Sequence, residues 1–308
     1  MKILLAGDFC PTECTDELFK SKDIKTLFGD TLSLFEGNDI NFVNMEGALT
    51  ESDAGIEKFG PCLKGTPIAA EVMKDVGINL VGLSNNHIFD YGIQGYKDTV
   101  AALDEQGIAY TGFGKNYEDA RKNYYFEKNG EKIAFVCVCE SEYSYALEDR
   151  MGSRLFDCYD TIADVREAQK KSRTVIVAVS EGVELDGLDE FQSGKVDNFG
   201  HKYLSGIGKC LEELVQDRIG CKVRSVELNI LQRCAAHIAS ETDLAEAESL
   251  GVVAVKAAAQ GKTGMVSAIV NRNTADYIPN YGIVPVCDVA NKIKYVPREW
   301  INEAGNDV

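Results

Sequence analysis

The chain has 308 residues, of which 45% are hydrophobic and 26% charged, a balance typical of globular proteins. Its formal net charge of −17 disfavours nucleic acid and anionic membrane surfaces as partners. The first apolar run stops at Gly7-Asp8, and no run approaches the ~20 residues of a membrane span. Ten cysteines without a CxxC pair are typical of reduced thiols, so we expect a cytoplasmic protein.

Polar side chains follow the first two predicted strands. Residues 2–7 (KILLAG) predict a buried strand, with Asp8 directly beyond it. After a helix within 15–36, residues 40–43 predict a second buried strand, which leads into the sequence NME at 44–46. A carboxylate therefore stands at the end of each strand.

A third predicted strand, 79–83, leads into the sequence SNNHIFDYG at 84–92. Two amides, an imidazole and a carboxylate lie close together in this stretch, and all of them can bind divalent cations. Taken alone, the stretch is equally consistent with an Asn-rich turn that caps the next helix, with His87 bonded to a backbone carbonyl. That helix has an apolar face from Ile93 to Leu103 and is expected to end at Gly107.

The carboxyl ends of neighbouring strands share one edge of an α/β layer, so we expect these polar groups to form one site. The motifs G-D-x-x-P, N-x-E and N-N-H-x-x-D-x-G, in this order, resemble the CapA family of poly-γ-glutamate capsule synthesis proteins, which is related to calcineurin-like metallophosphoesterases. The resemblance runs from residue 1 to about 173. It includes the sequence GIAYTGFG at 107–114 and the predicted strand at 132–139.

The CapA resemblance implies a site for a divalent metal ion, of which Mn, Fe, Zn and Mg are the candidates. Four residues would face the metal: Asp8, Glu46, Asn86 and His87. Three would support them from behind, the first of them by fixing the histidine: Asp90, Asn44 and Asn85. The metal would act as a Lewis acid and activate water, with Asp8 and His87 as catalytic residues. The implied substrate is a small-molecule phosphate or a polyglutamate-type polymer.

The resemblance changes near residue 174. CapA relatives continue with a strand that ends in a histidine, whereas Ser180 stands at that place here, after the predicted strand 175–179. From 174 to 303 the chain resembles the C-terminal part of bacterial 6-phosphofructokinases of the clostridial ATP- or pyrophosphate-using type. The matching segments are VSEGV at 179–183, DNFGH at 197–201, KVRSVELNILQRC at 222–234, ASETD at 239–243, GKTGMV at 261–266 and VPREW at 296–300.

The phosphofructokinase resemblance implies that Glu181, Arg224 and Arg233 help to hold fructose 6-phosphate. Guanidinium groups suit phosphate oxygens, and a carboxylate accepts from sugar hydroxyls. In tetrameric relatives the position of Arg224 reaches across a subunit interface, so a homo-oligomer formed through this half is implied. The alternative is that both arginines make solvent or interface salt bridges.

Residues 1–173 contain neither the Gly-rich loops nor the T-I-D-x-D segment that a phosphofructokinase needs. We therefore expect an α/β chain that joins a calcineurin-like metallophosphatase-type layered half, 1–173, to a phosphofructokinase-type α/β half, 174–308, both incomplete. Within the second half, spacing predicts a helix over 204–219, a strand at 223–230 and a helix capped by Ser240. Three functions are then open: a metal-dependent hydrolase or capsule polymer-synthesis protein, a phosphotransferase-related sugar-phosphate-binding fragment, or a catalytically inert binding module.

Overall fold

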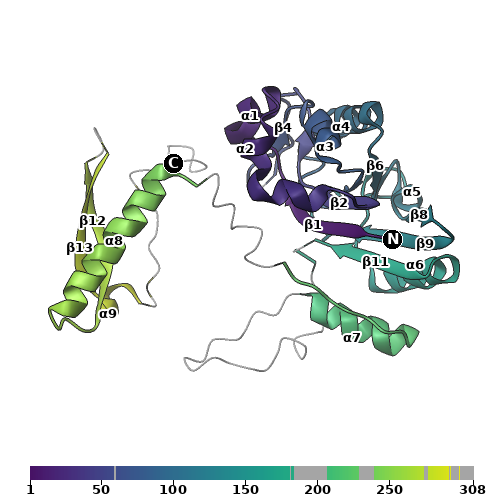
Figure 1. The fold of residues 1–308 in the computed structure, drawn as a ribbon. Coiled ribbons are helices and arrows are strands. Elements are labelled where there is room, and N and C mark those ends of the chain that lie inside the picture. Colours follow the sequence, from purple (N-terminus) through teal and green to yellow (C-terminus); the bar gives the residue numbers. More distant parts are fainter. Residues whose placement is uncertain are drawn as a thin grey trace. The chain divides into compact units, whose positions relative to one another are not determined.

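The computed structural model describes residues 1–58, 60–180, 182–183, 207–228, 239–273, 277–290, 292 and 298. The chain divides into two compact units, residues 1–235 and 236–308, and each is considered by itself (Figure 1). The boundary expected at 173/174 was placed where the family resemblance changes, whereas the boundary at 235/236 separates two compact units. The compact units therefore do not test the expected boundary, which stays a prediction.

The first unit alternates strands and helices, which confirms the expected α/β class. Its strands are β1 (Ile3–Phe9), β2 (Ile40–Met45), β3 (Ala48–Leu49), β4 (Lys64–Gly65), β5 (Leu80–Gly82), β6 (Ala109–Thr111), β7 (Phe113–Gly114), β8 (Tyr124–Lys128), β9 (Glu131–Val138), β10 (Gly152–Ser153) and β11 (Thr174–Val179). Its helices are α1 (Asp16–Lys20), α2 (Ile24–Phe28), α3 (Ala69–Val76), α4 (Gly92–Gln106), α5 (Tyr117–Ala120), α6 (Cys158–Lys171) and α7 (Ile207–Ile219), with 3₁₀ helices η1 (Glu13–Thr15) and η2 (Gly29–Phe35).

Two sheets form the centre of this unit. The first is parallel throughout, in the order β1-β2-β5-β6. The second has the order β11-β9-β8, with β11 parallel and β8 antiparallel to β9. Asp8 of β1 is in register with Asn44 of β2, which is in register with Gly82 of β5. The carboxyl ends of these three strands therefore lie at one edge, as the sequence predicted.

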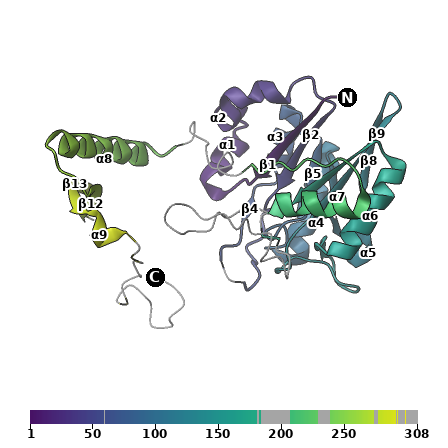
Figure 2. The same ribbon diagram turned by 90° about the horizontal axis from the view of Figure 1, so that it is seen from below.

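The sheets pack face to face with helices outside them, as Figure 1 shows from the side; Figure 2 shows the same layers from below. Between the sheets, the rings of Phe42 and Phe135 stack with centroids 5.4 Å apart. On the outer side of the first sheet, Met73 of α3 joins the same core cluster as Val81 of β5. On the outer side of the second sheet, Val165 of α6 packs on β9. The result is a four-layer α/β/β/α arrangement with one apolar cluster at each layer contact.

Helix α4 ends as predicted, where Gly107 adopts a φ of +64° in the left-handed region that favours glycine. The expected apolar face is confirmed at Leu103, which is buried, and at Tyr96, which packs against the core, but not at Ile93, which is 52% exposed. The face toward β3 instead contains Gly95 and Thr99, and the Thr99 hydroxyl accepts from the Leu49 amide at 2.8 Å. These small residues allow the helix to approach the short strand closely.

Two predicted strands need correction. Strand β1 runs through Phe9, so Asp8 lies within it and not beyond it; the strand resumes its pairing with β2 after an irregularity that follows Leu5. The strand expected at 223–230 is wrong over 223–228, where the backbone forms no strand, and the remaining two residues lie outside the described ones. Val226 is 82% exposed there, since no described strand pairs with this segment.

The second unit consists of α8 (Glu241–Ala259), β12 (Met265–Asn273), β13 (Ile278–Pro285) and α9 (Val286–Val289). The two strands form an antiparallel pair that contacts α8. The cap predicted for α8 is confirmed, because the Ser240 hydroxyl accepts from the Asp243 amide at 3.3 Å. Across all described helices, none combines the length and apolar character needed to cross a bilayer.

Removing the aromatic ring of Phe135 should destabilise the first unit. The side chain is fully buried between the sheets, so Phe135→Ala leaves a cavity and should cost about 3–5 kcal/mol in denaturant unfolding. Tyr159→Ala is the matched control, because that ring is 82% exposed and its loss should change stability by less than about 0.5 kcal/mol. Equal effects of the two variants would contradict the four-layer packing.

Candidate functional site

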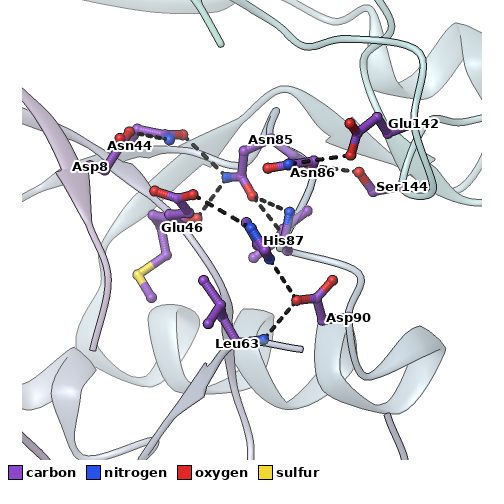
Figure 3. A network of polar contacts seen from close by, with 12 residues as sticks. Asp8, Asn44, Glu46, Leu63, Asn85, Asn86, His87, Asp90, Glu142 and Ser144 are labelled. Atoms are coloured by element: carbon purple, nitrogen blue, oxygen red, sulfur yellow. Dashed lines mark hydrogen bonds and ion pairs between the residues drawn. The ribbon is translucent and has the colours of Figure 1, made fainter. Parts of the chain in front are cut away.

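The ends of β1, β2 and β5 are joined by a chain of hydrogen bonds between side chains (Figure 3). The Asn44 amide donates to Asp8 Oδ1 at 2.8 Å, and the Asn85 amide donates to Asn44 Oδ1 at 3.2 Å. The same edge borders a cavity of about 1310 Å³, which is lined in part by Asp8, Asn44, Glu46, Asn85 and Asn86. Polar groups that are far apart in sequence thus share one cleft.

Asn85 organises the turn that follows β5. It is 1% exposed, and its Oδ1 accepts from the amides of His87 at 3.0 Å and Ile88 at 2.8 Å. Its Nδ2 also donates to the Met45 carbonyl at 2.8 Å. The Asn-rich turn considered from sequence therefore exists, but Asn85 acts on the backbone, and the residue preceding α4 is Tyr91, without a side-chain cap.

His87 lies between two carboxylates. Its Nδ1 is 2.8 Å from Asp90 Oδ2, and its Nε2 is 3.9 Å from Glu46 Oε1. Lys58 Nζ also approaches Nδ1, at 3.1 Å. The alternative in which a backbone carbonyl satisfies the ring is not what the structure has. Asp90 stands where the CapA resemblance places a residue that fixes the histidine.

The loop after β9 adds two side chains to this edge. Glu142 Oε2 accepts from the Asn86 amide at 3.3 Å, and the Ser144 hydroxyl donates to the Asn85 carbonyl at 2.6 Å. Sequence reasoning gave neither residue a role, although both follow the predicted strand 132–139. Polar residues that follow a predicted strand could have indicated both side chains, since the same pattern identified Asp8.

Cys10 is a further side chain that the sequence did not single out. Burial, followed by the negative charges of Glu46, Asp8 and Asp90, raises the pKa of its thiol to about 12. Asp90 is paired with Lys58, so Glu46 and Asp8 contribute most of the negative charge around Cys10. Such a region attracts cations and repels a phosphate that arrives without one.

The expected metal set is only partly brought together. Among the described residues, no group of three or more His, Cys, Asp or Glu side chains lies close enough to hold a metal ion. A tetrahedral ion with bonds of ~2.1 Å brings two donors to ~3.4 Å, so the 3.9 Å between His87 Nε2 and Glu46 Oε1 would have to close by about 0.5 Å for one ion to bind both. Imidazole and carboxylate are suitable donors for such an ion. Asp8 and Asn86 are engaged with Asn44 and Glu142.

Of the three residues predicted to hold a sugar phosphate, only Arg224 lies among the described residues. It is exposed and borders a cavity of about 530 Å³, together with Glu212 and Lys222. Glu181 and Arg233 lie outside the described residues. Ser180, at the position of the histidine found in CapA relatives, follows β11 and donates its amide to the Val138 carbonyl at 3.1 Å.

A layered unit with carboxylate, amide and imidazole groups gathered at parallel strand ends defines an α/β protein with a polar site at one edge of its sheet. Within that class, the chain belongs to the bacterial capsule synthesis protein family PGA_cap, whose model matches residues 2–188. The CapA resemblance read from the sequence is thereby confirmed.

Two curated relatives represent the two resemblances. The PGA biosynthesis protein CapA of Bacillus subtilis is 27% identical over 190 residues, which cover 58% of this chain and 48% of that protein. A pyrophosphate–fructose 6-phosphate 1-phosphotransferase of Halomonas elongata is 35% identical over 151 residues, covering 49% of this chain and 36% of that protein. The chain thus spans less than half the length of either relative.

One solved structure in the comparison is a putative 5'-nucleotidase from Staphylococcus aureus in complex with alpha-ketoglutarate. It is 15% identical, with a TM-score of 0.38, and the alignment covers 68% of this chain and 42% of that chain.

The thiol of Cys10 should react slowly with iodoacetamide. A pKa of about 12 leaves roughly one thiolate in 10⁴ molecules at pH 8, and the thiolate is the reactive form. Peptide mapping should find the exposed Cys14 alkylated first, with the Cys10 rate rising as the pH approaches 12. Glu46→Gln removes one raising charge and should speed the Cys10 reaction. Equal rates at both cysteines in the unmodified chain would refute the partly buried, anionic setting of Cys10.

Proposed function

We propose that the first unit is a metal-dependent phosphoesterase-type protein of capsule poly-γ-glutamate synthesis. The observation that carries this proposal is the 3.9 Å approach of His87 Nε2 to Glu46 Oε1 at the shared end of the parallel strands. Membership of the PGA_cap family gives the biological setting. The substrate proposed is a small-molecule phosphate or a polyglutamate-type polymer.

Glu46 and His87 would hold the ion, and Asp8 and Asn86 would complete its ligands by rotating from their present partners. A divalent ion bound there supplies Lewis acidity and a water of lowered pKa. Asp90 holds the histidine ring from behind at 2.8 Å. Because the edge is anionic, an anionic substrate is repelled until a cation balances the carboxylates.

One residue of the second half, Ser180, limits the number of metal ions that this site can hold. Ser180 offers a hydroxyl where CapA relatives have an imidazole, so we propose one tightly held ion and not a dinuclear centre. The proposed layout joins a metallophosphatase-like half, 1–173, to a phosphofructokinase-like half, 174–308, through β11. A homo-oligomer formed through the second half belongs to the same proposal.

Replacing His87 should remove both the metal and any hydrolysis that depends on it. His87→Ala should bind Mn²⁺ or Zn²⁺ at least 10-fold more weakly in equilibrium dialysis, because the ion loses a direct ligand. Its hydrolysis of p-nitrophenyl phosphate should fall to the metal-free level.

The chain offers a matched control, since His201 and His237 are its other two histidines and belong to the second half. His201→Ala and His237→Ala should keep wild-type metal content. Metal content that is the same in all three variants would show that the proposed centre is misplaced.

A second candidate is sugar-phosphate binding by the phosphofructokinase-like half. The observation that favours it is the 35% identity to a protein named for fructose 6-phosphate phosphorylation. Of the three residues implied, Arg224 is exposed and therefore available to an anionic ligand. Phosphoryl transfer also requires a donor site with its metal, and the sequence lacks the family's segments for one. We therefore propose binding without turnover.

The purified chain should not phosphorylate fructose 6-phosphate with either ATP or pyrophosphate in a coupled assay. Titration with fructose 6-phosphate should instead show weak binding that falls as salt rises, because guanidinium–phosphate attraction is screened. Arg224→Ala and Arg233→Ala should each weaken this binding. Turnover that disappears in Arg233→Ala would make phosphotransfer the leading function.

A further inference from the structure

Lys58 is a buried cation beside the site, outside the proposed metal set. It lies in the irregular segment between β3 and β4, and its side chain is 3% exposed. Its Nζ lies 2.5 Å from Asp90 Oδ1 and 3.1 Å from His87 Nδ1. A lysine is rarely buried so completely without a charged partner, and here the partner is Asp90. The lysine thus contacts the ring at Nδ1 and leaves Nε2, the nitrogen nearest Glu46, to the site.

Asp90 divides its two oxygens among three donors. Oδ1 accepts from Lys58, while Oδ2 accepts from the Leu63 amide at 2.7 Å and lies 2.8 Å from His87 Nδ1. The Asp90 side chain is 0% exposed, so water does not compete for these positions. The lysine and the Leu63 amide together fix the rotation of the carboxylate that presents Oδ2 to the ring.

The partner of Nδ1 decides which ring nitrogen of His87 carries the proton. Nδ1 has a single in-plane direction for a hydrogen bond; an ionised carboxylate only accepts and an ammonium only donates. A bond to Asp90 places the proton on Nδ1, whereas a bond to Lys58 places it on Nε2. The contact with Asp90 is the shorter of the two, at 2.8 Å against 3.1 Å, which favours the carboxylate as the partner of Nδ1.

We propose that Lys58 is a positioning residue, which holds Asp90 so that His87 stays in the Nδ1–H form with the Nε2 lone pair turned toward Glu46. The centroid of the Tyr143 ring lies 5.8 Å from the lysine nitrogen, and the ring adds a further favourable contact for the ammonium. Only the consequence of this role rests on the proposed function: a lone pair on Nε2 is what a metal ligand must offer.

The direct test is the tautomer of His87 in the metal-free full chain. Long-range ¹H–¹⁵N correlation spectra of ¹⁵N-histidine protein at alkaline pH distinguish the two neutral forms. In a His201→Gln, His237→Gln background only His87 gives signals. We expect the Nδ1–H form in this background, a mixture with Nε2–H in Lys58→Met, and recovery of the Nδ1–H form in Lys58→Arg, which can still donate to Asp90.

A double-mutant comparison separates positioning from a merely structural role. In the Asp90→Asn background the lysine itself can donate to Nδ1. If Lys58 acts through Asp90, then Lys58→Met should therefore cause no further shift toward the Nε2–H form once Asp90→Asn is present. The double variant also buries no unpaired charge, so it supplies a folded reference if Lys58→Met alone does not fold. An unchanged tautomer in folded Lys58→Met, or a further shift toward Nε2–H in the Asp90→Asn background, would overturn the proposal.

Metal titration supplies the second readout. Lys58→Met should bind Mn²⁺ or Zn²⁺ about 10–100-fold more weakly than the wild type, the usual effect of losing a residue that orients a ligand. If the wild type binds metal and Lys58→Met binds it with the same affinity, the positioning role is contradicted. A wild-type protein that binds no metal would remove the proposed function, while the tautomer result would still decide the role of Lys58.

Discussion

The buried amide of Asn85 holds the ends of β2 and β5 together, and the geometry of the whole site depends on it. It makes four hydrogen bonds, to Asn44, to the Met45 carbonyl and to two amides of its own turn. A typical net hydrogen bond contributes only ~1 kcal/mol, but a buried amide left without partners costs ~1–3 kcal/mol. Any other position of the turn would therefore leave several polar groups unpaired inside the protein.

Much of the edge at which the site lies was predictable from the sequence. Apolar runs located β1, β2 and β5, and the rule that parallel strands end at one edge then brought Asp8, Asn44 and His87 together. The contacts of Lys58 were not predictable, because they join an irregular segment to residues 29 and 32 positions away. Such contacts depend on how a loop folds back, which no periodic pattern encodes.

The error at 223–228 has a different cause. An alternating pattern describes a surface suited to a sheet, but a strand also needs a neighbour to supply its hydrogen bonds. β11 shows the opposite case, since it follows the point where the family resemblance changes and still pairs along its length with β9. The sequence pattern alone could not distinguish these two segments. They differ in that β11 has a partner strand and 223–228 has none among the described strands.

The parallel pairing of β9 with β11 also affects how the protein is made. Val138 is in register with Val179, so 41 residues must be added before the last pair of this ladder can form. At roughly 5–20 residues per second, a ribosome takes about 2–8 s to synthesise that stretch. For that time the central strand of the second sheet has an unpaired edge, and a chaperone that covers it would protect the nascent chain from association with its neighbours.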